Sequence, residues 1–307
     1  MKPRWQTVAL PFTLAALLGL ATVVQVVRDR VFAHQAVEDQ LLYVRSGSVM
    51  QRAALSYGAV LADLYWIRAL QHYGRERGKP DGQRRYELLY PLLNLATTLD
   101  SRFTVGYRFG AIFLAEPHPG GAGRPDQAIA LLKNGIAANP GKWDYYHDVG
   151  FIYYWNLHDY QKAAEWFQRG ADVPGAPWWL RTYAAVMLTR GGDLQSSRAM
   201  WQQLSRNEEN DWLRRTAQLR LMQLDALDQI DTLKRTVSEF ARTTGRPPSS
   251  WEQMIAAGVL RGIPIDPAAT PYTLIPSTGD VKVAAWSKLH PLPTEPKAAP
   301  EMKAPAY

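Results

Sequence analysis

The sequence predicts a mainly α-helical protein, in which a right-handed solenoid of helical repeats follows one transmembrane helix and precedes a small α+β module. An uncharged stretch lies at 8–27, a pattern of small and large residues recurs within 57–210, and a short helix and a β-hairpin are expected within 244–283. Apolar residues make up 47% of the 307 residues, which is enough to fill a sizeable core.

The stretch at 8–27 has twenty residues without a charge, and a helix of that length spans about 30 Å of hydrocarbon. Lys2 and Arg4 precede it, which favours a cytoplasmic N-terminus. We therefore expect residues 1–30 to form a cytoplasmic flank and an anchor in the bacterial cytoplasmic membrane, with the repeats in the periplasm. A cleaved signal peptide is the alternative, but the apolar core is long and no small-residue cleavage site follows it directly.

After a connecting segment at 31–56, four predicted helices place a small and then a large residue at the same two positions. These positions are held by Leu89 and Leu93, Ala128 and Leu132, Ala163 and Phe167, and Ser197 and Trp201, where Leu89 departs from the pattern. The last three pairs follow one another at spacings of 35 and 34 residues. A fixed period of this size is typical of helical repeats.

Each of these four helices follows another predicted helix, in which a small residue stands three positions before a large one. The pairs are Ala62 and Tyr65, Gly110 and Phe113, Gly150 and Tyr153, and Ala185 and Leu188. A small side chain lets two helices approach closely, and the large residue fills the space beside it. The pattern predicts stacked helix pairs within 57–210, with Gly150 at a close contact.

Together these positions resemble the tetratricopeptide repeat family over about residues 57–207. The family's motif of small and large residues over 34 positions implies a solenoid whose first helices line a concave side. Insertions rich in Gly, Pro or charge, at 74–85 and after Ala115, depart from the motif, and we expect them to be surface loops of an irregular array. A helical bundle without true repeats is the alternative.

The segment 211–290 is expected to hold a long helix, from about Asp211 to Thr244, and a small module. Ser249 and Ser250 are suited to cap a short helix that ends near Gly258, and two short strands are expected at 272–275 and 281–283. The module would serve as a cap for the repeats or as a binding element. The Pro- and Ala-rich residues 291–307 are expected to be a disordered tail.

This module resembles the C-terminal region of type II secretion major pseudopilins over residues 244–283. The resemblance rests on Thr244, Gly245, Pro248, Asp266, Pro267, Pro271 and Tyr272. Ala268 and Ala269 replace the Trp and Gly of the family loop, and the pilin processing motif is missing, so the chain is not expected to be a pilin. The family's calcium site is not carried over, because Asp266 and Asp280 alone remain as loop carboxylates and calcium needs six to eight oxygens.

The residues give no support for catalysis. The chain has no Cys, and its six His show no metal-ligand spacing. It also lacks a G-x-S-x-G nucleophile turn and a phosphate-binding loop. We expect no enzyme activity, no cofactor or metal, and no small-molecule substrate, since an enzyme would have to assemble a carboxylate or His cluster from distant repeats. The net charge of +7 is scattered, so no nucleic acid is expected as a partner.

Aromatic and Arg residues on the first helices are the candidates for binding a protein partner. The chain has 11 Trp and 15 Tyr against 8 Phe, and such rings with a polar group suit interfaces. The candidates are Tyr107, Arg108, Tyr146, His147, Tyr153, Trp155, Trp178 and Arg181. Some of these rings could instead pack between helices. The sequence thus predicts a membrane-anchored scaffold for envelope proteins, in an assembly or secretion apparatus, or alternatively a permanent subunit of a membrane complex.

Overall fold

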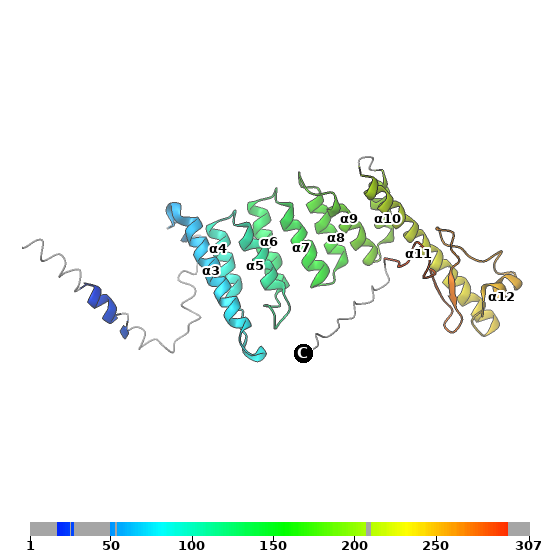
Figure 1. Cartoon of the computed structure of the whole chain (residues 1–307), viewed down its shortest axis with the longest axis horizontal. Helices are drawn as coiled ribbons and strands as arrows, with labels where there is room; N and C mark the ends of the chain where they lie inside the picture. Colours follow the sequence, from blue (N-terminus) through cyan, green and yellow to red (C-terminus); the bar gives the residue numbers. More distant parts are fainter. Residues whose placement is uncertain (1–16, 25, 28–49, 53, 207–209, 294–307) are drawn as a thin grey trace, which may run out of the picture. The chain divides into compact units, whose positions relative to one another are not determined.

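A computed structural model describes residues 17–24, 26–27, 50–52, 54–206 and 210–293. Helices make up most of this part of the chain, and its two strands form one small antiparallel sheet (Figure 1). The described residues fall into two compact units, divided between Arg124 and Pro125. The prediction of a mainly helical fold with a small hairpin is therefore confirmed.

The predicted membrane anchor is described in part. Residues 17–24, 26 and 27 are helical and exposed, whereas residues 8–16 and 25 of the same stretch lie outside the described ranges. Within those ranges, no helix combines the length and the apolar character needed to cross a membrane. The anchor stays a prediction, as does the tail at 291–307, of which only residues 291–293 are described.

Besides the helical residues 17–24, 26–27 and 50–52, unit 1 contains five helical segments. They are η1 (Leu55–Tyr57), α3 (Gly58–Arg77), η2 (Asp81–Gln83), α4 (Leu89–Leu99) and α5 (Thr104–Ala115). Helix α4 packs against both α3 and α5. Ala62 and Tyr65 of α3 and Leu89 and Leu93 of α4, which hold the predicted small and large positions, are all buried. Leu89 is therefore a core residue even though a small side chain was expected there.

The two insertions in unit 1 are joined to each other. Arg84, in the loop after α3, donates from Nη1 to the carbonyl of Pro119 at 2.8 Å, and the Tyr86 hydroxyl donates to the same carbonyl at 3.2 Å. The Tyr73 hydroxyl of α3 donates to Oε2 of Glu116 at 2.6 Å, and burial, together with this bond, raises the pKa of Tyr73 to about 12. The predicted irregular loops thus form a polar network.

A buried carboxylate holds the first loop to α3. Glu76 is 3% exposed, and its carboxylate accepts from Nζ of Lys79 at 2.7 Å and from the backbone N–H of Arg85 at 2.9 Å. Burial by itself raises the pKa of Glu76, but these two donors lower it by more, and the net pKa lies below the usual value. The charged form of Glu76 therefore stabilises this turn of the chain.

Replacing Glu76 with Gln should lower the free energy of unfolding by about 1–3 kcal/mol at pH 7, because a neutral amide replaces a charged acceptor of buried bonds. The folded-state pKa is depressed, so the stabilisation is present above the unfolded-state pKa and is lost as the pH falls through the folded-state value. Urea unfolding of the parent and the variant at pH 7 and pH 3.5 measures the loss in free energy of unfolding, which should be smaller at pH 3.5. An equal loss at both pH values, or in the exposed control Glu87→Gln, would contradict it.

Unit 2 contains the other helices and the sheet. Its elements are α6 (Pro125–Ala138), α7 (Trp143–Trp155), α8 (Tyr160–Ala171), α9 (Trp179–Arg190), α10 (Leu194–Ser205), α11 (Asp211–Thr244), α12 (Trp251–Ala256), β1 (Thr273–Ile275) and β2 (Asp280–Lys282). From α6 to α11, each helix packs against the next (Figure 1). The carboxylates of Asp159 and Asp193 cap α8 and α10 by accepting backbone N–H bonds.

Gly150 lies at a close contact between α7 and α8. A Cβ atom at Gly150 would lie 2.8 Å from the Phe167 ring and 3.2 Å from the carbonyl oxygen of Ala163. The equivalent residues Ser197 and Trp201 of α10 are also buried. The predicted close contact and the pairing of helices in unit 2 are confirmed, and the right-handed solenoid stays a prediction.

Replacing Gly150 with Leu should lower the free energy of unfolding by on the order of 1–3 kcal/mol, because the new side chain overpacks against Phe167. Replacing a Gly inside a helix also stabilises the helix by roughly 1 kcal/mol, and the cost of overpacking exceeds this gain. Gly141, in the turn before α7, has open space around its Cβ position and provides a control for an added side chain that meets no neighbour. Chemical denaturation of both variants measures the difference, and a Gly150→Leu protein as stable as Gly141→Leu would contradict the assigned contact.

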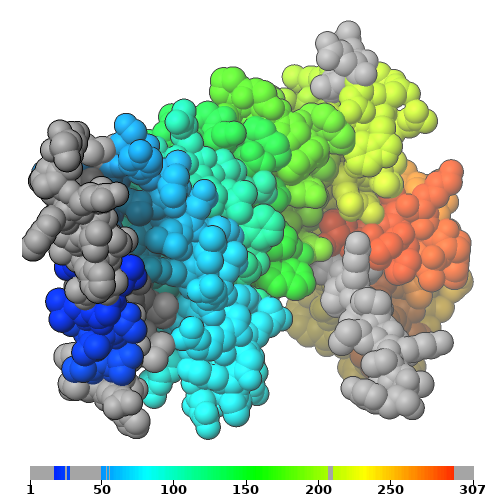
Figure 2. All heavy atoms as spheres, turned by 60° about the vertical axis from the view of Figure 1, so that its left-hand side comes forward, coloured from blue at the N-terminus to red at the C-terminus, as the bar shows by residue number. Residues whose placement is uncertain are grey.

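The predicted long helix is α11, which begins and ends as expected. Its first half contributes Leu213 and Ala217 to the core shared with α9 and α10, and its second half contributes Ile230 and Phe240 to the core of the module. Figure 2 shows the orange and red residues of the module gathered against α11, in yellow. Gly245 ends the helix with a φ of 78°, which a side chain would disfavour.

The module is the predicted helix followed by a hairpin. The Ser250 hydroxyl caps α12 by accepting from the backbone N–H of Gln253, and Leu274 of β1 pairs with Val281 of β2. The loop before β1 is held by Asp266, whose buried carboxylate accepts the backbone N–H groups of Ala268 and Thr270 and the hydroxyl of Ser287. Asp266 therefore stabilises the fold of this loop.

Candidate partner-binding surface

Two of the eight predicted binding residues, His147 and Trp155, lie on one face of α7, where Trp155 is exposed and His147 is half-buried. The other two rings predicted on this helix face α8 instead. The Cβ of Tyr146 is 3.0 Å from the Cβ position of Gly170, and Nζ of Lys162 lies 5.5 Å from the centre of the Tyr153 ring. Tyr146 and Tyr153 therefore contribute mainly to the contact between the two helices.

The remaining four predicted residues lie elsewhere. In unit 1, Tyr107 is buried and its hydroxyl donates to the carbonyl of Thr97 at 3.2 Å, while Arg108 is half-buried. In unit 2, the Trp178 ring lies 5.5 Å from the Trp212 ring, and Arg181 lies 3.5 Å from the Asp172 carboxylate. Within unit 2, no ring contact or hydrogen bond joins Trp178 or Arg181 to His147 or Trp155 among the described residues.

Aromatic rings from α7 and α9 form a continuous cluster, which we call the aromatic surface. It consists of His147, Phe151 and Trp155 of α7 and Trp179 and Tyr183 of α9. Along α7, ring centres are 6.3 Å apart from His147 to Phe151 and 6.2 Å from Phe151 to Trp155. Across to α9, His147 lies 5.5 Å from Trp179, edge to face, and 6.3 Å from Tyr183. These are favourable separations for aromatic pairs.

A core residue supports this surface from below. Phe167 of α8 is fully buried, and its ring centre lies 5.7 Å from His147 and 5.6 Å from Tyr183. The surface rings therefore rest on a ring that is fixed by the contact with Gly150. This gives the surface a defined shape.

The aromatic surface exposes much of its apolar area. Phe151 is 45% exposed, Trp155 is 60% exposed and Tyr183 is 45% exposed. At its edge, Arg190 donates from Nη1 to the Tyr154 hydroxyl at 2.8 Å. Contiguous exposed apolar patches of this kind mark interaction sites in soluble domains, and aromatic and Arg residues provide most of the energy at protein interfaces.

Sequence reasoning missed Phe151, Trp179, Tyr183 and Arg190. Their spacing was an available signal, because Phe151 lies four residues from both His147 and Trp155, and Tyr183 lies four residues after Trp179. Residues four apart share one face of a helix. The predicted set contained rings from several faces of α7. The spacing of four residues assigns His147 and Trp155 to one face and leaves Tyr146 and Tyr153 on others.

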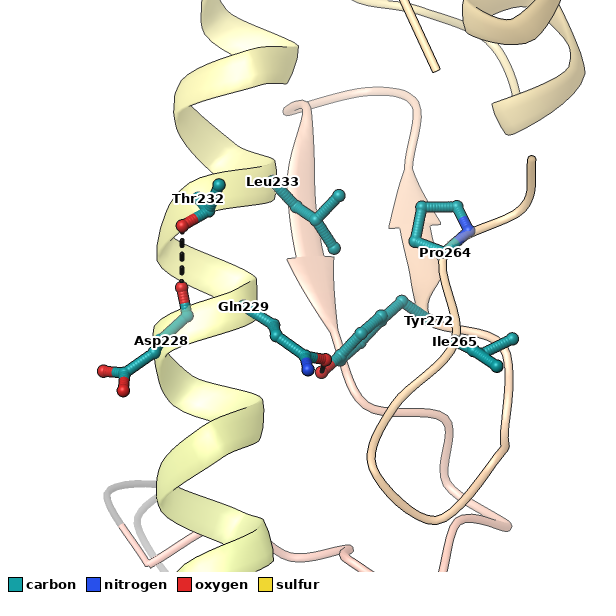
Figure 3. A pocket seen from close by; sticks show the side chains of 7 residues that line it. All are labelled: Asp228, Gln229, Thr232, Leu233, Pro264, Ile265 and Tyr272. Carbon is teal, nitrogen blue, oxygen red and sulfur yellow. Dashed lines mark hydrogen bonds between the residues drawn. The ribbon is translucent and has the colours of Figure 1, made fainter. Parts of the chain in front are cut away.

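An open pocket of about 400 Å³ lies between α11 and the loop before β1 (Figure 3). The Tyr272 hydroxyl donates to Oε1 of Gln229 at 2.7 Å, and burial raises the pKa of this Tyr above its usual value. The Asp228 carboxylate points away from the pocket in Figure 3 and pairs with Arg198. The remaining lining, including Leu233 and Ile265, is largely apolar, so no set of titratable groups converges within this pocket.

No group of three or more His, Cys, Asp or Glu residues that could hold a metal ion is found in the described part of the chain. Comparisons with known proteins add no relatives, since neither a known protein family nor a curated protein matches the sequence. The resemblances to tetratricopeptide repeats and to pseudopilins therefore stay predictions.

Proposed function

We propose that this chain is a membrane-tethered helical scaffold that binds a protein partner through the aromatic surface. The proposal rests mainly on one observation, the exposed rings of Phe151 and Trp155, which stack on each other and are joined through His147 to the exposed Tyr183 ring above the buried Phe167. Fully burying a large apolar side chain contributes about 1.5–3 kcal/mol, so covering these partly exposed rings would supply several kcal/mol to binding.

The tether is supported by the uncharged stretch at 8–27 and the basic residues before it. In this proposal the two units lie in the bacterial periplasm and the partner is another envelope protein. The resemblance of residues 244–283 to pseudopilins supports an assembly or secretion apparatus as the setting. The same features also suit a permanent subunit of a membrane complex. A stoichiometric complex that survives detergent would favour the subunit, and substoichiometric capture would favour the scaffold.

Replacing Phe151 and Trp155 together with Ala should reduce capture of the native partner at least tenfold, since both rings contribute contact area. The melting temperature should stay close to that of the parent, because both side chains are about half exposed. Quantitative mass spectrometry of proteins that copurify from the source cells measures capture. Trp212→Ala is the matched control, because Trp212 is 59% exposed and lies outside the aromatic surface. Unchanged capture by the double variant, with the fold intact, would overturn the proposal.

The tether has its own test. Intact-mass spectrometry of the protein purified from membranes should find residues 8–27 still attached, because the apolar run is twenty residues long and no small-residue cleavage site follows it directly. A mature N-terminus near Ala33 or Val37 would show instead that the stretch is a cleaved signal peptide. The mature protein would then have no membrane anchor. The copurification experiment would still test the aromatic surface.

A further inference from the structure

Helix α3 of unit 1 has an exposed apolar face, which we call the α3 stripe. It consists of Val60, Leu64 and Ile67, together with Tyr57 directly before the helix. Residues three or four positions apart share one side of a helix. Val60 is 63% exposed, Tyr57 is 69% exposed, and the other two side chains are exposed as well. The α3 stripe is therefore an apolar surface that is open to solvent.

Other sides of α3 are occupied by its neighbours. Ala62 and Tyr65 are buried, and the helix packs against α4. The Trp66 ring stacks on the Phe113 ring of α5, with 6.1 Å between ring centres. The α3 stripe lies on the side that neither neighbour covers. Since the terminal helices of repeat arrays need a polar outer face for solubility, an apolar outer face indicates an interaction site.

The charges of α3 favour an anionic partner surface. The helix carries three arginines against two carboxylates, and of these carboxylates Asp63 is exposed whereas Glu76 is buried. Arg75 is exposed in the last turn and follows Leu64 by eleven residues. Eleven residues make about three helical turns, so Arg75 lies on the same side of α3 as the stripe. Apolar side chains with Arg beside them are typical of helices that lie in the plane of a lipid surface.

Two observations favour the membrane over a protein as the partner of this face. The stripe has four side chains, whereas a stable protein interface takes about 20–30 residues from each side. Residues 28–57 separate the predicted anchor from α3, and a chain of that length spans at most about 100 Å. Contact between α3 and the membrane would therefore be an intramolecular event, for which a weak affinity is sufficient.

We propose that the α3 stripe lies on the membrane surface, with its apolar side chains among the lipid headgroups and Arg75 against an anionic headgroup. The inference rests on the tether in the proposed function and adds a second contact with the membrane. Tyr57 suits such a contact, because amphipathic aromatic rings are enriched where membrane meets water. Contact along α3 would fix the orientation of unit 1 relative to the membrane.

The test uses the absence of Cys from the chain, because a single added Cys can carry a fluorescent label. The full chain with Val60→Cys, labelled with an environment-sensitive dye, is reconstituted into vesicles of phosphatidylethanolamine and phosphatidylglycerol that also contain a nitroxide-labelled lipid. The nitroxide should quench at least about half of the emission, because the apolar face of an interfacial helix lies about 5–10 Å deep in the headgroup region. Val259→Cys places the same label at an exposed Val of the module and should keep most of its emission.

A second arm replaces phosphatidylglycerol with phosphatidylcholine, which has no net charge. Quenching at residue 60 should then fall, because Arg75 loses its anionic partner. Equal quenching in the two lipid mixtures would overturn the role assigned to Arg75.

Vesicle flotation separates failure of this inference from failure of the tether. A chain that does not float with the vesicles would overturn both. A chain that floats while the label at residue 60 is quenched no more than the label at residue 259 would overturn the inference and leave the tether. Emission at residue 60 that is blue-shifted but not quenched would also overturn it, because a second copy or another part of the chain would then cover the stripe. The aromatic surface lies in unit 2, and partner capture tests it separately.

Discussion

The close approach of α7 and α8 at Gly150 determines the structure of the surface that unit 2 presents. Because Gly150 has no side chain, the Phe167 ring occupies the space that a Cβ atom would need. Phe167 then lies under both His147 of α7 and Tyr183 of α9, at 5.7 and 5.6 Å between ring centres. The helix contact and the aromatic surface are therefore parts of one packing arrangement, and a change in the first alters the second.

Much of the fold could be predicted because its signals are local. Small residues at fixed spacing located the close contact at Gly150, and the hydroxyl of Ser250 marked the start of α12. The bonds from Arg84 and Tyr86 to the Pro119 carbonyl could not be predicted. They join loops more than thirty residues apart in the sequence, and their geometry depends on how three helices place those loops.

The binding surface was less predictable, since it depends on which face each ring occupies. Tyr107 and Trp155 have similar chemistry, yet Tyr107 is buried in unit 1 and Trp155 is exposed. Composition does not distinguish them, because the rotation of a helix is set by all its contacts together.

The half-exposed rings of Phe151 and Trp155 cost free energy in the isolated chain, because water contacts much of their apolar area. An apolar partner surface would relieve this cost. The Tyr154 ring adjoins both of these rings, and its hydroxyl accepts a bond from the exposed Arg190. A partner that covers Phe151 and Trp155 would therefore also meet a hydroxyl and a positive charge at the edge of the same surface, so its apolar and polar contacts would be made together.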